Sequence, residues 1–486
     1  MQMFLPVLAL LSRILMAFSL AFLVPLAWAW AEDAPALRAV WGGCFALTLG
    51  SGWLLWLISR RHRRELQARD GFLLVNLVWV VLTLFAAVPL AYTVPGISWS
   101  HAYFEAMSAL TATGATALQG LDALPVSVNI WRCFLQLIGG LGIMLLVVAV
   151  LPMLGLGGMQ LYKAETPGPM KDTRFTPRIA ETARGLWGVY FVFSGLCLLA
   201  YRWAGMSWAD AFMHMCSTMG LGGFSSHDAS FGHWNSPAIE GVAMVFMALS
   251  GISFMRYFMV IRARSLRPIT SDREIRTYLF VLAASTATLT LMLLAHQTYA
   301  EFPAALRASA FHVISLATTT GYASTDYAQW PVAAPVLLLF LGCFVSCAGS
   351  TGGGIKMVRM VLLIKQARRE LVRIIHPRVV NPVTLGGQVL PSSVMTAVLG
   401  FMLIYGAATM GLTLLLLFSG LDIVTAFSAV VATVNNIGPG LGQVGPAGNF
   451  GGLNAFQLWV LSFAMLLGRL ELLSVLVLFT GGFWRK

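Results

Sequence analysis

Charged residues are scarce in this chain. Of its 486 residues, only 10% are Asp, Glu, Lys or Arg, whereas soluble domains have about 25%. Hydrophobic residues make up 58% of the chain, and the mean hydropathy is +0.79. A helix needs about 20 apolar residues to cross a bilayer, which leaves room for roughly ten spans. The composition excludes a soluble globular protein and predicts an all-α polytopic membrane protein.

Motifs of common enzyme and cofactor sites are also missing. The sequence has no CxxC pair, no HExxH, no P-loop and no GxGxxG between a strand and a helix. A membrane enzyme, such as a lipid-linked transferase, would need paired carboxylates or a His/Asp cluster, but the acids are scattered singly. We therefore expect no enzyme activity, no covalently bound cofactor and no disulfide among the six cysteines. We interpret four histidines as structural or vestibular: His214, His227, His233 and His312.

Positive charge is concentrated in four segments. The net charge is +12, and residues 60–70, 160–185, 262–276 and 365–378 each hold five Lys or Arg. Basic residues of membrane proteins gather in cytoplasmic loops, so this interpretation is preferred to nucleic-acid binding. The sequence thus predicts a multi-pass membrane protein with a cytoplasmic C-terminus. The opposite face has ten acids against four arginines, which favours a cation as the transported species.

The first 70 residues predict two extra N-terminal helices. Residues 3–30 are apolar, and Ala27-Trp28-Ala29 is similar to a signal-peptidase site. The apolar stretch is longer than an ordinary signal peptide and rich in Trp. We expect a retained helix, with cleavage as the alternative. A second span covers about 36–59.

Four copies of one unit follow, in residues 71–160, 161–265, 266–378 and 379–486. Each contains a span, a shorter apolar segment, a polar run with glycine, and a second span. The short segments cannot cross the bilayer and are expected to be re-entrant. A Phe precedes the glycine by ten residues in three units and by eleven in the fourth. These pairs are Phe104 and Gly114, Phe212 and Gly222, Phe311 and Gly321, and Phe427 and Gly438.

The polar runs are candidates for a cation filter. Irregular backbone inside a membrane is tolerated only where it is buried in protein or lines a water-filled path. Extended runs supply carbonyl oxygens that can replace the water around a cation, and glycine adopts positive φ at little cost. Glycines that serve only helix packing are the alternative, which is weak for four matched runs. The candidate filter residues are Thr111, Ala112, Thr113, Gly114, Gly220, Leu221, Gly222, Thr318, Thr319, Thr320, Gly321, Asn435, Asn436, Ile437 and Gly438.

A second glycine-rich run interrupts the long segment 332–365. Three consecutive glycines, each about 1 kcal/mol worse than alanine in a helix, predict a break at mid-membrane depth. Arg469 lies inside the last predicted span (453–480), where a charge is costly and should face the pore or a partner. Glu471 does not share its helix face, so the two should not pair. The candidate gate residues are Gly349, Ser350, Thr351, Gly352, Gly353, Gly354 and Arg469, with Lys356 either assisting or snorkelling to the interface.

Several of these pieces resemble the TrkH/TrkG–KtrB superfamily of potassium uptake proteins, and its TrkH branch most closely. The resemblance covers nearly the whole chain. It is carried by Thr111–Thr116, Gly222–Asp228, Ala317–Asp326, Asn435–Gly442, Cys347–Lys356 and Gly468–Glu471.

The resemblance implies two N-terminal helices and four helix–pore-loop–helix repeats around a single pore, with two such subunits in a homodimer. In the family, glycine at all four filter positions goes with potassium selectivity, and serine in the first repeat goes with sodium permeation. It also implies that Gly349–Gly354 form an intramembrane gating loop and that Arg469 meets it as a barrier to cations. One departure is Met219-Gly220-Leu221, where relatives usually have Ser or Thr.

Regulation by a partner is expected, because the loops leave no room for a nucleotide-binding domain. The resemblance implies a cytoplasmic nucleotide-binding ring, similar to TrkA, that docks on the basic loops; these loops could instead serve orientation and contact anionic lipids. The ion is expected to be K⁺. A sodium-permeable or cation-coupled (Na⁺ or H⁺) member of the same superfamily is the alternative, and the sequence leaves channel-like and coupled transport open.

Overall fold

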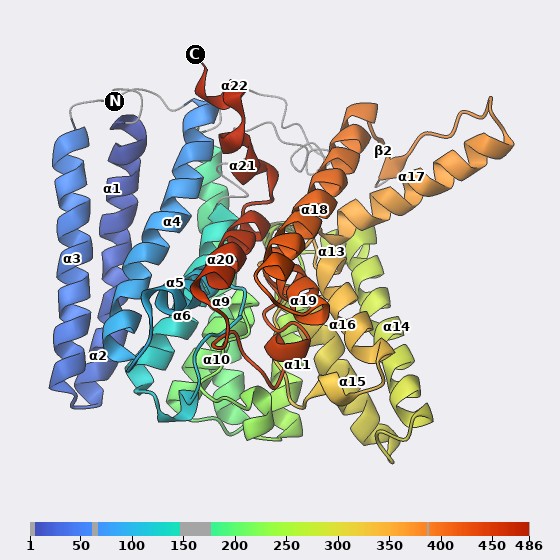
Figure 1. Cartoon of the computed structure of the whole chain (residues 1–486). Helices are drawn as coiled ribbons and strands as arrows, with labels where there is room; N and C mark the ends of the chain where they lie inside the picture. Colours follow the sequence, from blue (N-terminus) through green and yellow to red (C-terminus); the bar gives the residue numbers. More distant parts are fainter. Residues whose placement is uncertain (1–4, 61–66, 146–175, 386–387, 486) are drawn as a thin grey trace.

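The computed structural model describes residues 5–60, 67–145, 176–385 and 388–485. It is nearly all helical; a two-stranded hairpin, β1 (Thr384–Leu385) with β2 (Gln388–Val389), is the extended structure among the described residues. Most of the basic loop 160–185 and the Arg61–Arg64 cluster lie outside the described residues. Both ends of the chain emerge at the same end of the helical bundle (Figure 1). All six cysteines are free in the structure.

The two N-terminal helices stand at one side of the bundle (Figure 1). The first span runs through α1 (Leu5–Ser19), a short turn at Leu20–Phe22, and α2 (Leu23–Ala31). It packs along α3 (Pro35–Ser59). Glu32, at the end of α2, accepts hydrogen bonds from the backbone N–H groups of Val126 (2.6 Å) and Ser127 (3.2 Å). This carboxylate links the N-terminal pair of helices to the first repeat. Its donors lie at the start of the helix that begins at Val126, where backbone N–H groups have no partner within the helix.

The rest of the chain forms four helix–loop–helix units, which confirms the predicted fold class. The outer helices that begin the units are α4 (Ala68–Thr93), α9 (Thr176–Trp203), α14 (Arg273–Ala295) and α18 (Ser392–Phe418). Their short helices are α5 (Trp99–Leu110), α10 (Trp208–Gly220), α15 (Phe302–Ala317) and α19 (Ile423–Val434). The closing helices are α6 (Val126–Leu145), α11 (Pro237–Ser250), α16 (Ala333–Phe344) and α20 (Ala455–Arg469).

The units close into a ring. Each closing helix packs against the short helix of the next unit: α6 on α10, α11 on α15, α16 on α19, and α20 on α5. Three of the four short helices, α5, α10 and α19, begin with side-chain caps: Ser98, Ser207 and Asp422 accept hydrogen bonds from N–H groups of the first turn. The N-terminal ends of these helices are therefore fixed at one face, and their C-terminal ends converge inside the ring.

Two closing segments differ from the continuous spans expected. The predicted span 237–261 is α11 followed by α12 (Phe254–Ala263) at 81°, and 453–480 is α20 followed at 110° by α21 (Leu473–Leu476) and the turn Val477–Phe479. The segment 332–365 breaks after α16, as predicted, and continues in α17 (Met357–Ile375). Hydropathy shows neither of the first two bends, because the two helices of each bent pair are together long and apolar enough to be taken for one span.

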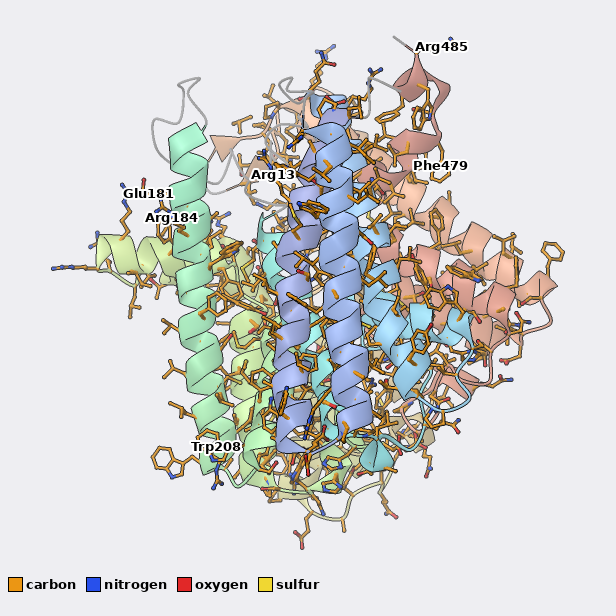
Figure 2. The ribbon with its side chains drawn as sticks, turned by 90° about the vertical axis from the view of Figure 1, so that its left-hand side faces the viewer. Arg13, Glu181, Arg184, Trp208, Phe479 and Arg485 are labelled. Carbon is orange, nitrogen blue, oxygen red and sulfur yellow. The ribbon has the colours of Figure 1, made fainter. Side chains whose placement is uncertain are left out.

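The remaining elements are small. They comprise α13 (Arg267–Thr270), α22 (Gly481–Trp484), and single turns at Leu121–Ala123, Ser230–His233, Tyr327–Gln329 and Gly442–Val444. In Figure 2, Arg13 and Arg184 lie toward the end of the bundle that carries Arg485, while Trp208 lies at the opposite end. A tryptophan at one end and basic residues toward the other match the two interfaces of a membrane.

Candidate functional site

The four loops that follow the short helices share one backbone conformation. In each loop, two residues spaced two apart have positive φ: Ala112 and Gly114, Leu221 and Gly223, Thr319 and Gly321, Asn436 and Gly438. In every loop, the N–H of the residue between these two donates to the carbonyl five residues earlier. The four donors are Thr113, Gly222, Thr320 and Ile437. The loops are therefore four copies of one turn at the C-terminal ends of the short helices.

This geometry corrects the alignment of the second unit. The sequence spacing matched Gly222 to the other three glycines, but the backbone places Gly223 there and puts Gly222 in the position of Thr113, Thr320 and Ile437. The physical reason is that Phe212 is the fifth residue of α10 whereas Phe104 is the sixth of α5, so a count of ten from the phenylalanine stops one residue short of the left-handed glycine. Gly223-Phe224 repeats the glycine–aromatic order of Gly321-Tyr322, a signal that could have set the register.

The loop glycines and the neighbouring carbonyls interlock in a closed ring. A β-carbon on Gly114 would lie 2.1 Å from the oxygen of Gly222, and one on Gly223 would lie 1.9 Å from the oxygen of Thr320. A β-carbon on Gly321 would lie 2.0 Å from the oxygen of Ile437. The ring closes because a β-carbon on Gly438 would lie 2.8 Å from the oxygen of Thr113.

Four backbone carbonyls, one per unit, thus face the glycine of the preceding unit. Only a residue without a side chain leaves room for the adjacent oxygen, and the positive φ independently favours glycine. Oxygens arranged this way around one axis are the ligands that replace water on a dehydrated alkali cation. We name the oxygens of Thr113, Gly222, Thr320 and Ile437 the ring carbonyls.

The hydroxyls of the loop threonines bind the protein behind the loops. Thr111 Oγ1 donates to the oxygen of Met107 (2.7 Å) and lies 2.7 Å from Thr113 Oγ1. Thr318 and Thr320 repeat this pair at 2.8 Å. Asn436 Nδ2 donates to Thr113 Oγ1 (2.8 Å), which joins loop four to loop one. These side chains brace the turns, so the departure from Ser or Thr at Met219–Leu221 removes bracing and leaves the backbone oxygens in place.

A buried ion pair supports loops one and two from behind. Arg132 of α6 and Glu105 of α5 are fully buried, with Nη2 and Oε1 2.7 Å apart and Nε donating to Oε1 at 2.8 Å. Arg132 Nη1 also donates to the oxygen of Ser225 (3.2 Å), and Glu105 accepts from the N–H of Ala117 (2.8 Å). The sequence placed both residues on the outer side and did not pair them, because their contact depends on how α5 meets α6.

The mouth of the ring holds a cavity lined by residues of all four loops, among them Gly114, Gly223, Ala323, Pro439 and His227. His227 pairs with Asp122 of the first unit and lies 3.5 Å from an oxygen of Asp210. Burial lowers the pKa of His227, but the hydrogen bonds to Asp210 and Asp122 outweigh burial and raise it. His227 was expected to be structural or vestibular; here it lies at the mouth and links two units.

The glycine-rich run lies directly beneath the ring, at the C-terminal ends of the short helices. A β-carbon on Gly353 would lie 2.1 Å from the oxygen of Asn435, and one on Gly352 would lie 2.9 Å from the oxygen of Thr318. Thr351 Oγ1 donates to the oxygen of Met219 (3.0 Å). The segment between α16 and α17 therefore packs against three of the four short-helix ends.

The guanidinium group of Arg469 binds this segment. Its side chain is 3% exposed; Nη1 donates to the oxygen of Thr351 and Nη2 to the oxygen of Gly139, both at 2.9 Å. The expected contact with the glycine run is present, and Arg469 does not pair with Glu471, which binds Arg359 Nη2 instead (2.5 Å). Lys356 Nζ donates to the oxygen of Gly352, so its side chain returns to the loop and does not snorkel.

Comparisons with known proteins place these features in a family. The TrkH model, described as cation transport protein, matches residues 40–486. This chain belongs to the TrkH family.

Three relatives show how far the similarity extends. The Trk system potassium uptake protein TrkH of Vibrio parahaemolyticus is 45% identical over 91% of both chains, and that of Halomonas elongata is 43% identical over 99% of both. The Trk system potassium uptake protein TrkG of Escherichia coli is 38% identical over 89% of this chain and 88% of its own. The crystal structure of the potassium transporter TrkH from Vibrio parahaemolyticus superimposes with a TM-score of 0.92 at 40% identity, covering 99% of this chain and all of that one.

The TrkH family is one of cation transporters, so the chain is a multi-pass membrane transporter and not an enzyme. In the described segments, seven helices are long and apolar enough to span a membrane, or nine if each bent pair counts as one.

Proposed function

We propose that this chain takes up potassium ions across the inner membrane through the pore bounded by the four loops, with the ring carbonyls as the selectivity filter. The observation that carries the proposal is the closed ring in which each loop glycine leaves room for the next unit's carbonyl. All four glycines are present, which in the family goes with potassium. Its relatives are named as potassium uptake proteins. The proposed filter comprises the fifteen residues predicted from the sequence together with Gly223.

We place the gate below the ring, at Gly349–Gly354 with Lys356 and Arg469. The run packs against the oxygens of Met219, Thr318 and Asn435, at the negative ends of short-helix dipoles that would otherwise face a permeating cation. The Arg469 guanidinium adds a fixed positive charge beside this path, which repels cations in a site of low dielectric. Transport requires the run to leave the axis.

The basic end of the bundle is proposed to face the cytoplasm, with the C-terminus inside and the acidic vestibule outside. Its basic loops would dock a nucleotide-binding ring similar to TrkA and contact anionic membrane lipids; no nucleic acid is involved. We also propose a homodimer. The helix α17 leans away from the bundle at this end (Figure 1), and it exposes Ile364, Leu371, Ile374 and Ile375, an apolar face that a second subunit could cover.

Sodium permeation, or coupling to Na⁺ or H⁺, is the alternative. Expression in a strain without potassium uptake systems should restore growth in low K⁺. Purified protein in liposomes should then carry K⁺ faster than Na⁺ under equal gradients. Equal Na⁺ and K⁺ flux would refute the potassium filter, and K⁺ movement that follows an imposed pH or Na⁺ gradient would establish coupling.

A further inference from the structure

The second loop is the one with no side chain at the ring position: Thr113, Thr320 and Ile437 correspond to Gly222. The backbone of Gly222 does not require glycine, because its φ is not positive. What excludes a side chain is Gln136 of α6. A β-carbon on Gly222 would lie 2.4 Å from Gln136 Cδ, 2.6 Å from Oε1 and 2.7 Å from Nε2.

Gln136 fills this space and binds the loop. The residue is fully buried. Its Nε2 donates to the oxygen of Gly222 at 2.7 Å, and its Oε1 accepts from the N–H of Phe224 at 3.2 Å. Within the described part of the chain, the other three ring carbonyls receive no side-chain hydrogen bond. One ligand oxygen of four is therefore held by a fixed donor that also competes with a cation for its lone pairs.

The opposite exchange occurs at the fourth loop. There the ring position carries a large side chain, Ile437, and the facing helix α16 carries a glycine. A β-carbon on Gly342 would lie 2.5 Å from Ile437 Cδ1. Because protein interiors are closely packed, a large side chain at one position requires a small residue at the position that faces it. The pairs Gly222 with Gln136 and Ile437 with Gly342 thus solve the same packing problem in opposite ways.

We propose that Gln136 is a positioning residue of the filter: it replaces the missing side chain of loop two and sets how strongly the Gly222 carbonyl binds a cation. The proposal rests on the potassium filter proposed above. Gln136 thus affects ion selectivity although it lies on α6, outside the four loops.

A paired exchange tests the volume argument. Gly222→Thr alone should abolish transport, because the threonine would overlap Gln136. Combining it with Gln136→Ala should restore K⁺ flux to at least a third of the wild-type value, since loop two then resembles loops one and three. A double variant no better than Gly222→Thr would overturn the proposal.

Gln136→Met tests the hydrogen bonds at nearly constant volume. We expect the K⁺/Na⁺ flux ratio to fall at least about threefold, the effect of losing one ordinary hydrogen bond, with a melting temperature close to the wild type. Gln457→Met is the matched control: Gln457 is also buried, but its amide binds Ser419 and Asn454, so the ratio should not change. An unchanged ratio in Gln136→Met would overturn the role. Absence of K⁺ flux in the wild type would instead refute the proposed function itself.

Independent evidence points to a metal site at the outer mouth. Asp122, His227 and His233 each offer a ligand atom, and these atoms lie within 4.8 Å of one another. The His227 and His233 rings stack with centroids 3.5 Å apart, and His233 Nδ1 is 3.9 Å from Asp122 Oδ1. Behind His227 Nε2 stands an oxygen of Asp210 at 3.5 Å. A carboxylate in this place orients a ligand histidine and strengthens it.

We infer that these three side chains bind a transition-metal dication of the zinc class. Two imidazoles and one carboxylate form a donor set typical of Zn²⁺ with an open fourth position. The His233 side chain is 44% exposed, so it can rotate out of the stack and bring its lone pair to the ion. Binding displaces any proton on the histidines. His227 also lines the cavity above the ring, where a bound dication would repel incoming K⁺.

Zinc chloride added outside liposomes tests this site. We expect micromolar Zn²⁺ to reduce K⁺ flux at least twofold, and His233→Ala to raise the required concentration at least tenfold. His101→Ala, at an outer histidine that binds Ser98 and Gly451, should leave the inhibition unchanged. Calorimetry should show one Zn²⁺ site that His233→Ala removes. Binding that persists in His233→Ala, or no binding at all, would mean that the cluster is only an ion pair.

Discussion

At the level of single residues, Arg469 is the side chain on which we expect closure of the proposed gate to depend most directly. Its two hydrogen bonds join the glycine run (Thr351) to the first unit (Gly139). Arg469→Ala removes both bonds, each with a charged donor and worth about 1.5–3 kcal/mol, and it removes the positive charge. We expect basal K⁺ flux of the protein without its partner to rise at least tenfold. Flux into liposomes measures this.

Arg202→Ala is the matched control, because Arg202 donates to the oxygen of Met206 at the end of α9, outside the pore. Its flux should equal the wild type. Basal flux that stays unchanged in well-folded Arg469→Ala protein would remove Arg469 from the gate.

The filter glycines allow an equally direct test. Gly321→Ala would place a β-carbon 2.0 Å from the oxygen of Ile437 at φ +85°, so the ring must distort. We expect K⁺ uptake to fall at least tenfold, measured as growth rescue in low K⁺. Gly420→Ala is the control for strain alone, because Gly420 has φ +95° and no atom within 4 Å of the added carbon. Similar losses in both variants would show that strain, not the ring, is responsible.

At the level of elements, the Glu105–Arg132 pair decides whether α5 and α6 hold loops one and two in place. Breaking a fully buried pair leaves one charge without compensation and costs about 3–5 kcal/mol. Arg132→Met should therefore lower the melting temperature clearly in detergent, and Glu105→Gln/Arg132→Met should lower it less than the single change. A thermal unfolding series of the single and double variants measures this. Additive losses would mean that the two residues act independently.

At the level of the whole molecule, the exposed apolar side chains of α17 predict contact with a second subunit. Leu371→Arg places a charge on this face, and we expect it to convert a dimer into a monomer, as judged by light scattering of the protein–detergent complex. Glu370→Arg is the control, since Glu370 is exposed and binds Arg373 within the same helix. A wild-type protein that is monomeric would refute the proposed dimer.

Much of the architecture could be predicted because it depends on local properties. Span length, the short segments and the break at Gly349–Gly354 follow from runs of apolar residues and glycines along the chain. The bends after Ser250 and Arg469 could not be predicted in this way. The first bend positions Gly251 and Phe254 against the glycine run, where Cys347 N–H donates to the oxygen of Gly251 (3.1 Å) and Phe254 N–H to that of Gly349 (3.2 Å). These hydrogen bonds join residues about a hundred positions apart in the sequence, so no local pattern predicts the bend.

The amino-acid sequence alone determined a membrane-embedded, fourfold repeated chain with a glycine in each loop, because hydropathy and the conformational freedom of glycine act locally. Only the tertiary structure decided that Gly223, not Gly222, stands in the ring, since the backbone takes the left-handed conformation at Gly223 and not at Gly222. It also decided which side chain fills the space beside Gly222 and which acid neutralises Arg132. Those outcomes depend on packing between units, which no stretch of sequence specifies by itself.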